Sequence, residues 1–320
     1  MSLIKLFFAP ALLAVCFSSC SQTTAPAHSP VAGVFIATTP CDEVSKKLLR
    51  IPPDGNYAMM KWRLELNQDP VTLNPMTYKL VVTYGMDKQG SRDFAEGAQT
   101  IEWKGKWVLE KTFTESAAVT VYTLRDENSS ASLSFLQAGP NLLHLLDEDR
   151  HLVIGTGAWS YTLNRVDPVP AAPFKLSIQT TSLPPLSTDS LIVGVFNGRT
   201  PCNNDLLALN GISANGCQII KCRLTLYQDI KTHEPTTFQL YTVYVGKGDN
   251  RYSTMGKWMM TKGTLTDHNA IVYQLEPDTG NPQSLLFLKA DDNILFMLDE
   301  NRNLLVGNEY VSFTLNRNKR

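Results

Sequence analysis

The sequence has no excess of charge of one sign, few cysteines and no long hydrophobic run. Its 29 basic and 30 acidic side chains leave a formal net charge of -1 over 320 residues, so the charge balance points to neither nucleic acid nor an anionic membrane surface as a partner. Six cysteines are too few for a disulfide-rich scaffold, and none shows the paired CxxC spacing of a zinc site. The longest apolar run holds only about a dozen residues, fewer than a transmembrane helix needs.

Local enzyme motifs are absent from the sequence as well. It contains no GxSxG, GxxxxGKS/T, GxGxxG or HExxH segment, so we expect a protein without catalytic activity. The composition excludes intrinsic disorder, because 43% hydrophobic residues supply enough apolar surface for packed cores. The length favours two domains.

Residues 1–20 have the features of a secretory signal peptide. A lysine precedes an apolar run, and two serines stand directly before Cys20. Small residues in front of a cysteine resemble the bacterial lipobox, in which the cysteine is lipidated and becomes the mature N-terminus. We predict that Cys20 is lipidated; Cys16 is the competing residue, and an ordinary secreted protein is the alternative.

Residues 21–30 are polar, contain proline and show no periodicity. Such a segment is suited to a flexible tether between a lipid anchor and a folded body, which makes the lipid bilayer the first predicted partner. In the Gram-negative lipoproteins that this N-terminus resembles, a residue other than aspartate after the cysteine implies sorting to the outer membrane. Here that residue is Ser21, so we expect an outer-membrane lipoprotein that faces the periplasm.

One sequence pattern occurs twice in the chain. Residues 33–41 (GVFIATTPC) return as residues 194–202 (GVFNGRTPC), an offset of 161. Four later segments keep the same order: KWRLELNQD at 61–69 and KCRLTLYQD at 221–229, GKW at 105–107 and 256–258, LDEDR at 146–150 and LDENR at 298–302, and YTLNR at 161–165 and FTLNR at 313–317. The chain is therefore predicted to hold two copies of one domain, over 31–166 and 191–320, joined by a proline-rich linker over 167–190.

Within each copy the apolar residues alternate with a period of two, which is typical of strands. Tyr78, Leu80, Val82 and Tyr84 follow this rule. Turn dipeptides such as Asn-Gly, Asp-Gly and Gly-Pro separate the segments, and we expect seven or eight strands per copy and no long helix. Many short alternating strands predict an all-β antiparallel barrel or sandwich, and closure into a barrel removes exposed edges.

The ordered set of motifs resembles a known family. A Gly-Val-Phe start, Pro-Cys, Gly211-Ile212, an alternating strand ending in aspartate, Gly-Lys-Trp, a Leu-Asp turn and a terminal Thr-Leu-Asn-Arg are together similar to the N-terminal domain of the NlpE-type copper-resistance and envelope-stress lipoproteins. The resemblance implies two tandem small lipocalin-like β-barrels of about 130 residues each. It also implies a binding or sensing role in envelope or copper stress, with an envelope sensor or membrane protein as partner.

The first loop departs from the family pattern. Family members carry Pro-Cys-x-x-Cys there, whereas Val44 and Asp205 take the place of the second cysteine in the two copies. The family makes Cys41 and Cys202 candidate copper ligands, but a lone thiol offers Cu(I) a single ligand. The alternative is that both are loop cysteines without a metal.

The remaining cysteines belong to the second copy. Cys222 shares its inward position with Leu224 and Leu226, so we expect it to pack in the core. On one strand Cys217 and Cys222 would lie about 16 Å apart, too far for a disulfide. In an oxidising periplasm we therefore predict a bridge between Cys202 and Cys217.

Other polar groups are predicted to serve the fold. The five histidines, at 28, 144, 151, 233 and 268, have no paired spacing and are expected to be solvated or incidental rather than ligands. Residues 147–149 are three acidic residues between two strands, which favours a hairpin turn over a paired-carboxylate site. Four methionines of the second copy, at 255, 259, 260 and 297, are read as core residues or as soft copper ligands.

Three functions remain open from the sequence. One is binding or sensing; a second is a carrier whose barrel holds a small hydrophobic ligand or lipid; a third is a structural or interaction lipoprotein. Interiors filled by Trp62, Trp107 and Trp258 would favour recognition by the surface, and an open apolar cavity would favour the carrier.

Overall fold

The computed structural model describes residues 30–113, 118–170, 191–213, 215–246, 248–264, 267–278 and 284–318. The predicted signal peptide, Cys20, nearly all of the tether and most of the predicted linker lie outside these residues, as does His28. Within them, no helix is long and apolar enough to cross a membrane.

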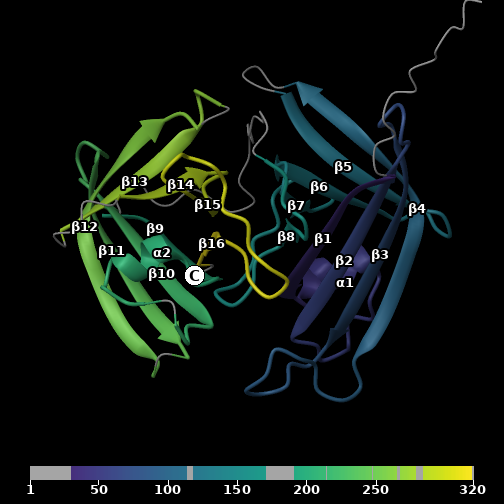
Figure 1. The fold of residues 1–320 in the computed structure, drawn as a ribbon, viewed down its shortest axis with the longest axis horizontal. Coiled ribbons are helices and arrows are strands. Elements are labelled where there is room, and N and C mark those ends of the chain that lie inside the picture. The colour runs from purple at the N-terminus through teal and green to yellow at the C-terminus, as the bar shows by residue number, and fades with distance from the viewer. Residues whose placement is uncertain are drawn as a thin grey trace, which may run out of the picture.

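The chain folds into two closed antiparallel barrels of eight strands each, as Figure 1 shows. In the first barrel, consecutive strands pair and β8 returns to β1; in the second, β16 returns to β9. The all-β prediction of two tandem barrels is thereby confirmed. The first barrel contains β1 (Val31–Pro40), α1 (Glu43–Leu49), β2 (Met59–Gln68), β3 (Pro75–Gly85), β4 (Gln99–Phe113), β5 (Ala118–Asp126), β6 (Ser132–Gly139), β7 (Leu142–Leu146) and β8 (Thr162–Arg165).

The second barrel repeats the same order of elements. It contains β9 (Ile192–Thr200), α2 (Asn204–Ala208), β10 (Ile219–Gln228), β11 (Pro235–Val245), β12 (Asn250–Lys262), β13 (Ile271–Pro277), β14 (Leu285–Lys289), β15 (Ile294–Leu298) and β16 (Thr314–Arg317). The strand registers also coincide, since Trp62 faces Val82 in the first barrel and Cys222 faces Thr242 in the second. The offset of 160 between these pairs is the offset of the sequence repeat.

Alternation along the strands decides which side chains enter the barrels. In β2, Met60, Trp62 and Leu64 are at most 3% exposed, while Lys61 and Arg63 between them point outward. A strand directs successive side chains to opposite faces, so the inward set forms the core and the charged set meets water.

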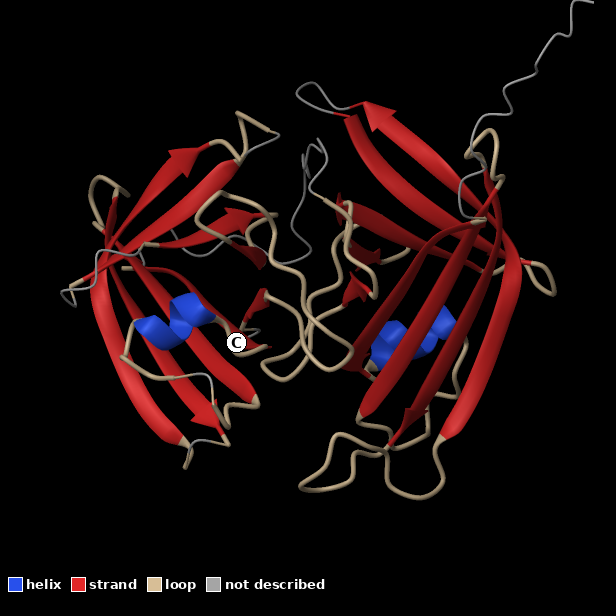
Figure 2. Cartoon of the chain, viewed as in Figure 1, coloured by secondary structure: helices blue, strands red, loops and turns tan. Residues whose placement is uncertain are grey.

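A short helix follows the Pro-Cys loop in each barrel (Figure 2). Asp42 caps α1, because its side chain accepts from the Ser45 backbone N–H while the Ser45 hydroxyl accepts from the Asp42 N–H. Leu48 and Leu49 of α1 belong to the core of the first barrel, and Leu206 and Leu207 of α2 to that of the second. The helices therefore pack on the barrel contents rather than standing free.

Candidate functional site

The interior of the first barrel is filled by two anchored indoles. Trp62 lies edge-on to Phe135, with 6.4 Å between ring centres, and its indole N–H donates to Thr39 Oγ1 at 2.8 Å. Trp107 belongs to the same core and donates to the Asn67 carbonyl oxygen at 2.7 Å. Packing and hydrogen bonding together hold both rings in place inside the barrel.

The interior of the second barrel is filled in a different way. Cys222 stands where the first barrel has Trp62, and Leu206 stands where it has Ser45, so a larger helix residue compensates for a smaller strand residue. Trp258 is retained, and its indole N–H donates to the Tyr227 carbonyl oxygen at 2.7 Å. The gap that remains has no room for a water molecule; its walls are Thr200, Leu206, Cys222, Leu240, Phe287, Met297, Phe313 and Leu315.

Cys41 lies at the end of the first strand as a buried free thiol, 6% exposed. Burial raises its pKa to about 11, although the nearby Lys46 opposes the shift. At neutral pH the group is therefore an uncharged thiol, and metal ions and electrophiles react with the thiolate. The position corresponding to Cys217 is held here by Tyr57, so Cys41 lacks the disulfide partner that the second barrel provides.

A disulfide joins Cys202 to Cys217, the pair that the sequence predicts, with Cα atoms 6.1 Å apart. It ties the loop before α2 to the segment before β10. The two residues are separated by 15 positions, and a closed loop of that size stabilises a fold by about 3 kcal/mol. The bridge and the metal role predicted for Cys202 exclude each other, because a disulfide sulfur is not a thiolate. Cys222 is the other free thiol of the described residues, and it lies in the core as expected.

The donors of the cysteine loops do not suit a copper ion. Cys41 and Cys202 lie in different barrels, one as a buried thiol and the other in a disulfide. Among the described residues, no group of three or more His, Cys, Asp or Glu side chains is placed to hold a metal. A Cu(I) site needs several soft ligands that converge. The cysteine loops therefore do not fit the metal that the family resemblance suggests.

The acidic residues after β7 form a turn, as predicted. Asp147 Oδ1 accepts from the N–H groups of Asp149 and His151 at 3.0 and 2.8 Å, and Arg150 has a φ of 67°. In the second barrel Asp299 Oδ1 accepts from the Asn303 N–H at 2.7 Å in the same manner. These carboxylates are used to shape the hairpin.

The core role expected for the methionines is wrong for three of the four. Met255, Met259 and Met260 of β12 are 59%, 38% and 54% exposed, whereas Met297 lies in the core. For Met255 and Met259 the reason is that Gly256 and Trp258 take the neighbouring inward positions of β12, which leaves both methionines on the outer face. Met260 shares the parity of Trp258 but lies beyond the buried part of the strand.

The two barrels contact each other through an interface that the sequence did not predict. One apolar cluster contains side chains of both repeats, among them Leu136 and Leu142 from the first and Val272 and Phe296 from the second. In Figure 1, β5 to β8 face β13 to β16 across the middle of the molecule. Strands β7 and β15 are buried at all five positions, because one face packs inside the barrel and the other against the partner repeat.

Equivalent residues of the two repeats meet at the centre of this contact. The hydroxyl oxygens of Ser160 and Ser312 are 2.6 Å apart, and those of Thr162 and Thr314 are 2.9 Å apart. In both pairs the residue numbers differ by 152, the offset of the repeat in this region. Self-pairing of equivalent residues is the property of a two-fold axis.

Two asparagines flank the centre and make the same contacts in opposite directions. Asn164 accepts from the Gly307 N–H at 2.8 Å and donates to the Asn308 carbonyl at 3.0 Å. Asn316 accepts from the Gly155 N–H at 2.9 Å and donates to the Thr156 carbonyl at 3.4 Å. Each contact maps onto the other when 152 is added or subtracted. The interface is thus isologous, like that of a symmetric homodimer, although it lies within one chain.

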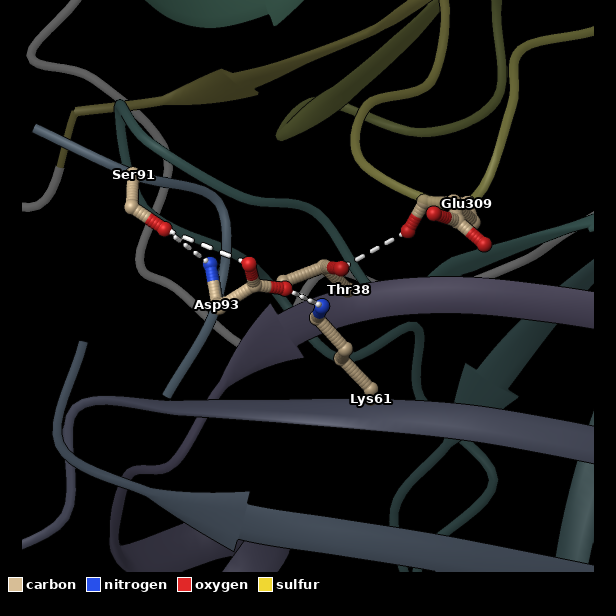
Figure 3. Close-up of polar contacts among 5 residues, drawn as sticks. All are labelled: Thr38, Lys61, Ser91, Asp93 and Glu309. Carbon is tan, nitrogen blue, oxygen red and sulfur yellow. Dashed lines mark hydrogen bonds and ion pairs between the residues drawn. The ribbon is translucent and has the colours of Figure 1, made fainter. Parts of the chain in front are cut away.

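Figure 3 shows the rim of the interface on the first barrel. The Thr38 hydroxyl of β1 donates to the Glu309 carbonyl oxygen of the second repeat at 2.7 Å. Beside it, Lys61 of β2 lies 3.3 Å from Asp93, which also accepts from Ser91. This ion pair is largely exposed, so its contribution is the orientation of Lys61 rather than much stability.

The rim also contains cation–aromatic contacts between the repeats. Lys61 and Arg92 lie 5.4 and 4.7 Å from the ring centre of Tyr310. On the opposite rim Arg199 lies 5.7 Å from the ring of Trp159. Such contacts are worth about 0.5–1 kcal/mol at exposed sites. They fix the outer edge of an interface whose centre is apolar.

His144 is not solvated but is a member of this interface. It is fully buried, its ring centre is 5.8 Å from that of Phe296 of the second repeat, and Nε2–H donates to the Val153 carbonyl at 3.0 Å. Nδ1 and the Thr162 hydroxyl are 2.9 Å apart. Burial lowers the pKa of His144 to about 4, so the ring is neutral at neutral pH.

Replacing His144 by phenylalanine, the residue at the equivalent position 296, is expected to make the protein less sensitive to acid. The pKa of histidine in an unfolded chain is about 6.5. Because the folded pKa is the lower one, His144 contributes stability above pH 6.5 that is lost as the pH falls from 6.5 towards 4. The shift from 6.5 to about 4 corresponds to about 3 kcal/mol.

Urea unfolding at several pH values between 7 and 4 measures this contribution. We expect the wild type to lose about 3 kcal/mol more than His144→Phe across that range. His268→Phe, at an exposed histidine, is the control and should follow the wild type. Parallel curves for the wild type and His144→Phe would show that His144 is not the acid-sensitive group.

The architecture defines a class of protein: two tandem eight-stranded antiparallel barrels with filled interiors. A family model, the NlpE N-terminal domain, matches residues 212–308, which cover most of the second barrel. The resemblance predicted from the sequence is thereby confirmed: the second barrel is an NlpE N-terminal domain, and the first barrel, with the same strand order, is consistent with a second one in tandem. Searches of curated proteins and of solved structures found no match.

Proposed function

We propose that the chain is a non-enzymatic outer-membrane lipoprotein, anchored through Cys20, that takes part in an envelope-stress response by recognising a partner protein with its outer surface. The observation that carries the proposal is the filling of both barrels. Trp62 and Trp107 occupy the first interior, and Leu206 and Trp258 the second, leaving no room for a water molecule in the remaining gap of the second barrel. Three functions are open from the sequence. Filled interiors favour recognition by the outer surface over the carriage of a ligand inside the barrel.

Copper enters this proposal only as a stress to which the cell responds. The single buried thiol of Cys41 and the disulfide of Cys202 supply no converging set of soft ligands. A chain of this kind would respond to copper through damaged or misdirected envelope proteins that it recognises. Envelope sensors and other membrane proteins are the partner class that this function requires.

Titration of the mature protein with a fluorescent fatty acid tests carriage against surface recognition. We expect no saturable binding, because the gap that remains inside the second barrel has no room even for a water molecule. A lipocalin with an open cavity serves as the positive control. Saturable binding of one fatty acid per barrel would contradict the proposal and favour the carrier.

The anchor is tested by metabolic labelling with palmitate. We expect Cys20→Ala to abolish the label and to release the protein from the membrane fraction, whereas Cys16→Ala retains both. The two variants carry the same substitution four positions apart, so they separate loss of the lipidated residue from a general defect in export. Equal labelling of wild type and Cys20→Ala would rule out Cys20 as the lipidated residue.

An envelope-stress transcription reporter tests the cellular role. Raised production of the wild type is expected to change the reporter output, and Cys20→Ala is expected to alter that response because the protein is no longer held at the membrane. An output that does not depend on the protein in either form would contradict a role in envelope stress.

A further inference from the structure

The turn between β2 and β3 presents apolar side chains to solvent on a rigid frame. Val71 is 77% exposed, the highest value among the large apolar side chains that the structure describes, and Leu73 is 46% exposed. Asp69 holds the frame: its Oδ1 accepts from the N–H groups of Val71 and Thr72 at 2.9 and 2.7 Å, and its N–H donates to the Asn74 carbonyl at 2.9 Å. The exposure of these side chains is therefore a fixed property of the turn.

Leu73 occupies this turn against its own backbone preference. Its φ is 60°, a left-handed conformation in which leucine is uncommon and asparagine, aspartate, histidine or glycine are favoured. Burial compensates for this only in part, since nearly half of the residue meets water. A residue that is strained and exposed contributes little to the fold, which points to a contact outside the molecule.

The second repeat contains the same turn with a different set of side chains, of which Ile230 is apolar and 46% exposed. Asp229 Oδ1 accepts from the N–H groups of Lys231 and Thr232 at 2.8 and 2.9 Å, and His233 has a φ of 59°. Lys231 and His233 stand where the first repeat has Val71 and Leu73. The backbone geometry of the turn therefore does not require apolar residues, and one repeat alone displays them at these two positions.

The apolar turn is the one next to the predicted anchor. The Gln68 N–H at the end of β2 donates to the Pro30 carbonyl at 2.7 Å, so the chain enters the first barrel beside this turn. Ten positions separate Pro30 from Cys20. A segment of that length with the flexibility predicted from its composition has an average span of about 17 Å. Acyl chains at Cys20 would hold this end of the first barrel near the bilayer.

We propose that the β2–β3 turn, residues 69–74, docks on the bilayer that carries the anchor, with Val71 and Leu73 inserted among the lipid headgroups and upper acyl chains. This inference rests on the lipidation of Cys20 in the proposed function. Exposed apolar side chains on a loop add to membrane binding in proportion to the area they bury in the interface. The docked turn would orient the first barrel against the membrane.

A fluorescent reporter of polarity, attached at Val71→Cys, tests the proposal in the lipidated full-length protein on vesicles of phosphatidylethanolamine and phosphatidylglycerol. The matched control is Lys231→Cys, the same position of the same turn in the second repeat. Burial raises the pKa of the Cys41 and Cys222 thiols to about 11 and about 12, so they should remain unlabelled. We expect a blue-shifted emission and several-fold stronger quenching by spin-labelled lipids at position 71 than at 231.

The outcomes separate the turn from the anchor. A protein that floats with the vesicles while the position-71 reporter stays in water would overturn the docking turn and leave the proposed function intact, as would equal quenching at 71 and 231. A protein that does not float would contradict the lipid anchor.

The turn is then tested in a chain whose first 20 residues are replaced by a histidine tag bound to nickel-chelating lipid. With a reporter at Met76→Cys, Val71→Lys together with Leu73→His should reduce the quenching to the level of the control.

Discussion

Replacing Trp62 by alanine is expected to lower the free energy of unfolding of the first barrel by about 3–5 kcal/mol, the usual cost of removing a buried large aromatic side chain. The indole is 3% exposed, and its N–H donates to Thr39 Oγ1, which is itself fully buried. The substitution therefore opens a cavity and removes the hydrogen-bond donor to a buried hydroxyl, which keeps its contact with the Pro40 carbonyl. Denaturant unfolding followed by tryptophan fluorescence and circular dichroism measures the change.

The second barrel provides the control for this prediction. Cys222→Ala, at the position equivalent to Trp62, removes a single sulfur atom and should cost much less than Trp62→Ala. Similar losses from the two substitutions would mean that the indole does not support the first barrel as its burial indicates.

Replacing Val272 by aspartate is expected to separate the two repeats while leaving each barrel folded. Val272 is completely buried, and its side chain lies in the apolar cluster shared by both repeats rather than inside the second barrel. A carboxylate there loses its hydration without gaining a partner, a change that costs about 3 kcal/mol or more. Small-angle X-ray scattering should show a larger radius of gyration, and circular dichroism should keep the β-sheet spectrum.

Ile271→Asp is the matched control for Val272→Asp. Ile271 is the preceding residue of β13 and is 39% exposed, so its aspartate remains hydrated. We expect this variant to scatter like the wild type. An unchanged radius of gyration in Val272→Asp would contradict the inter-repeat interface.

The barrels could be predicted from the sequence because their determinants are local. Alternation along segments such as 78–84 sets which side chains face inward, and the repeated motifs place the same strands in both copies. The core position of Cys222 and its inability to pair with Cys217 also follow from distances along one strand. These inferences require no knowledge of where the other repeat lies.

The interface could not be predicted in this way, because it depends on the placement of one whole barrel against another. A sign of it is present in the sequence: residues 142–146 (LLHLL) and 294–298 (ILFML) lack the alternation of the other strands. An uninterrupted apolar strand is buried on both faces. The same burial on both faces accounts for the buried position of His144 in β7. The absence of a second histidine at a paired spacing says nothing about whether His144 is buried.

The copper expectation shows the limit of a family motif. Pro-Cys is retained in both copies, yet the structure uses Cys202 for a disulfide with Cys217 and buries Cys41 as a neutral thiol. The missing second cysteine of the motif changes the chemistry of the loop more than the retained residues suggest. The spacing of the motif showed that its second cysteine is absent. The surroundings of the retained cysteines, Cys41 and Cys202, became clear only from the fold.

The central claim is that the two NlpE-like repeats form one unit through an isologous interface that does not depend on the linker. A protease site inserted between residues 171 and 190 tests it most directly. After complete cleavage, size-exclusion chromatography with light scattering should show one species with the combined mass of both repeats, which Val272→Asp converts into two. Two separate species from the cleaved wild-type chain would contradict the claim.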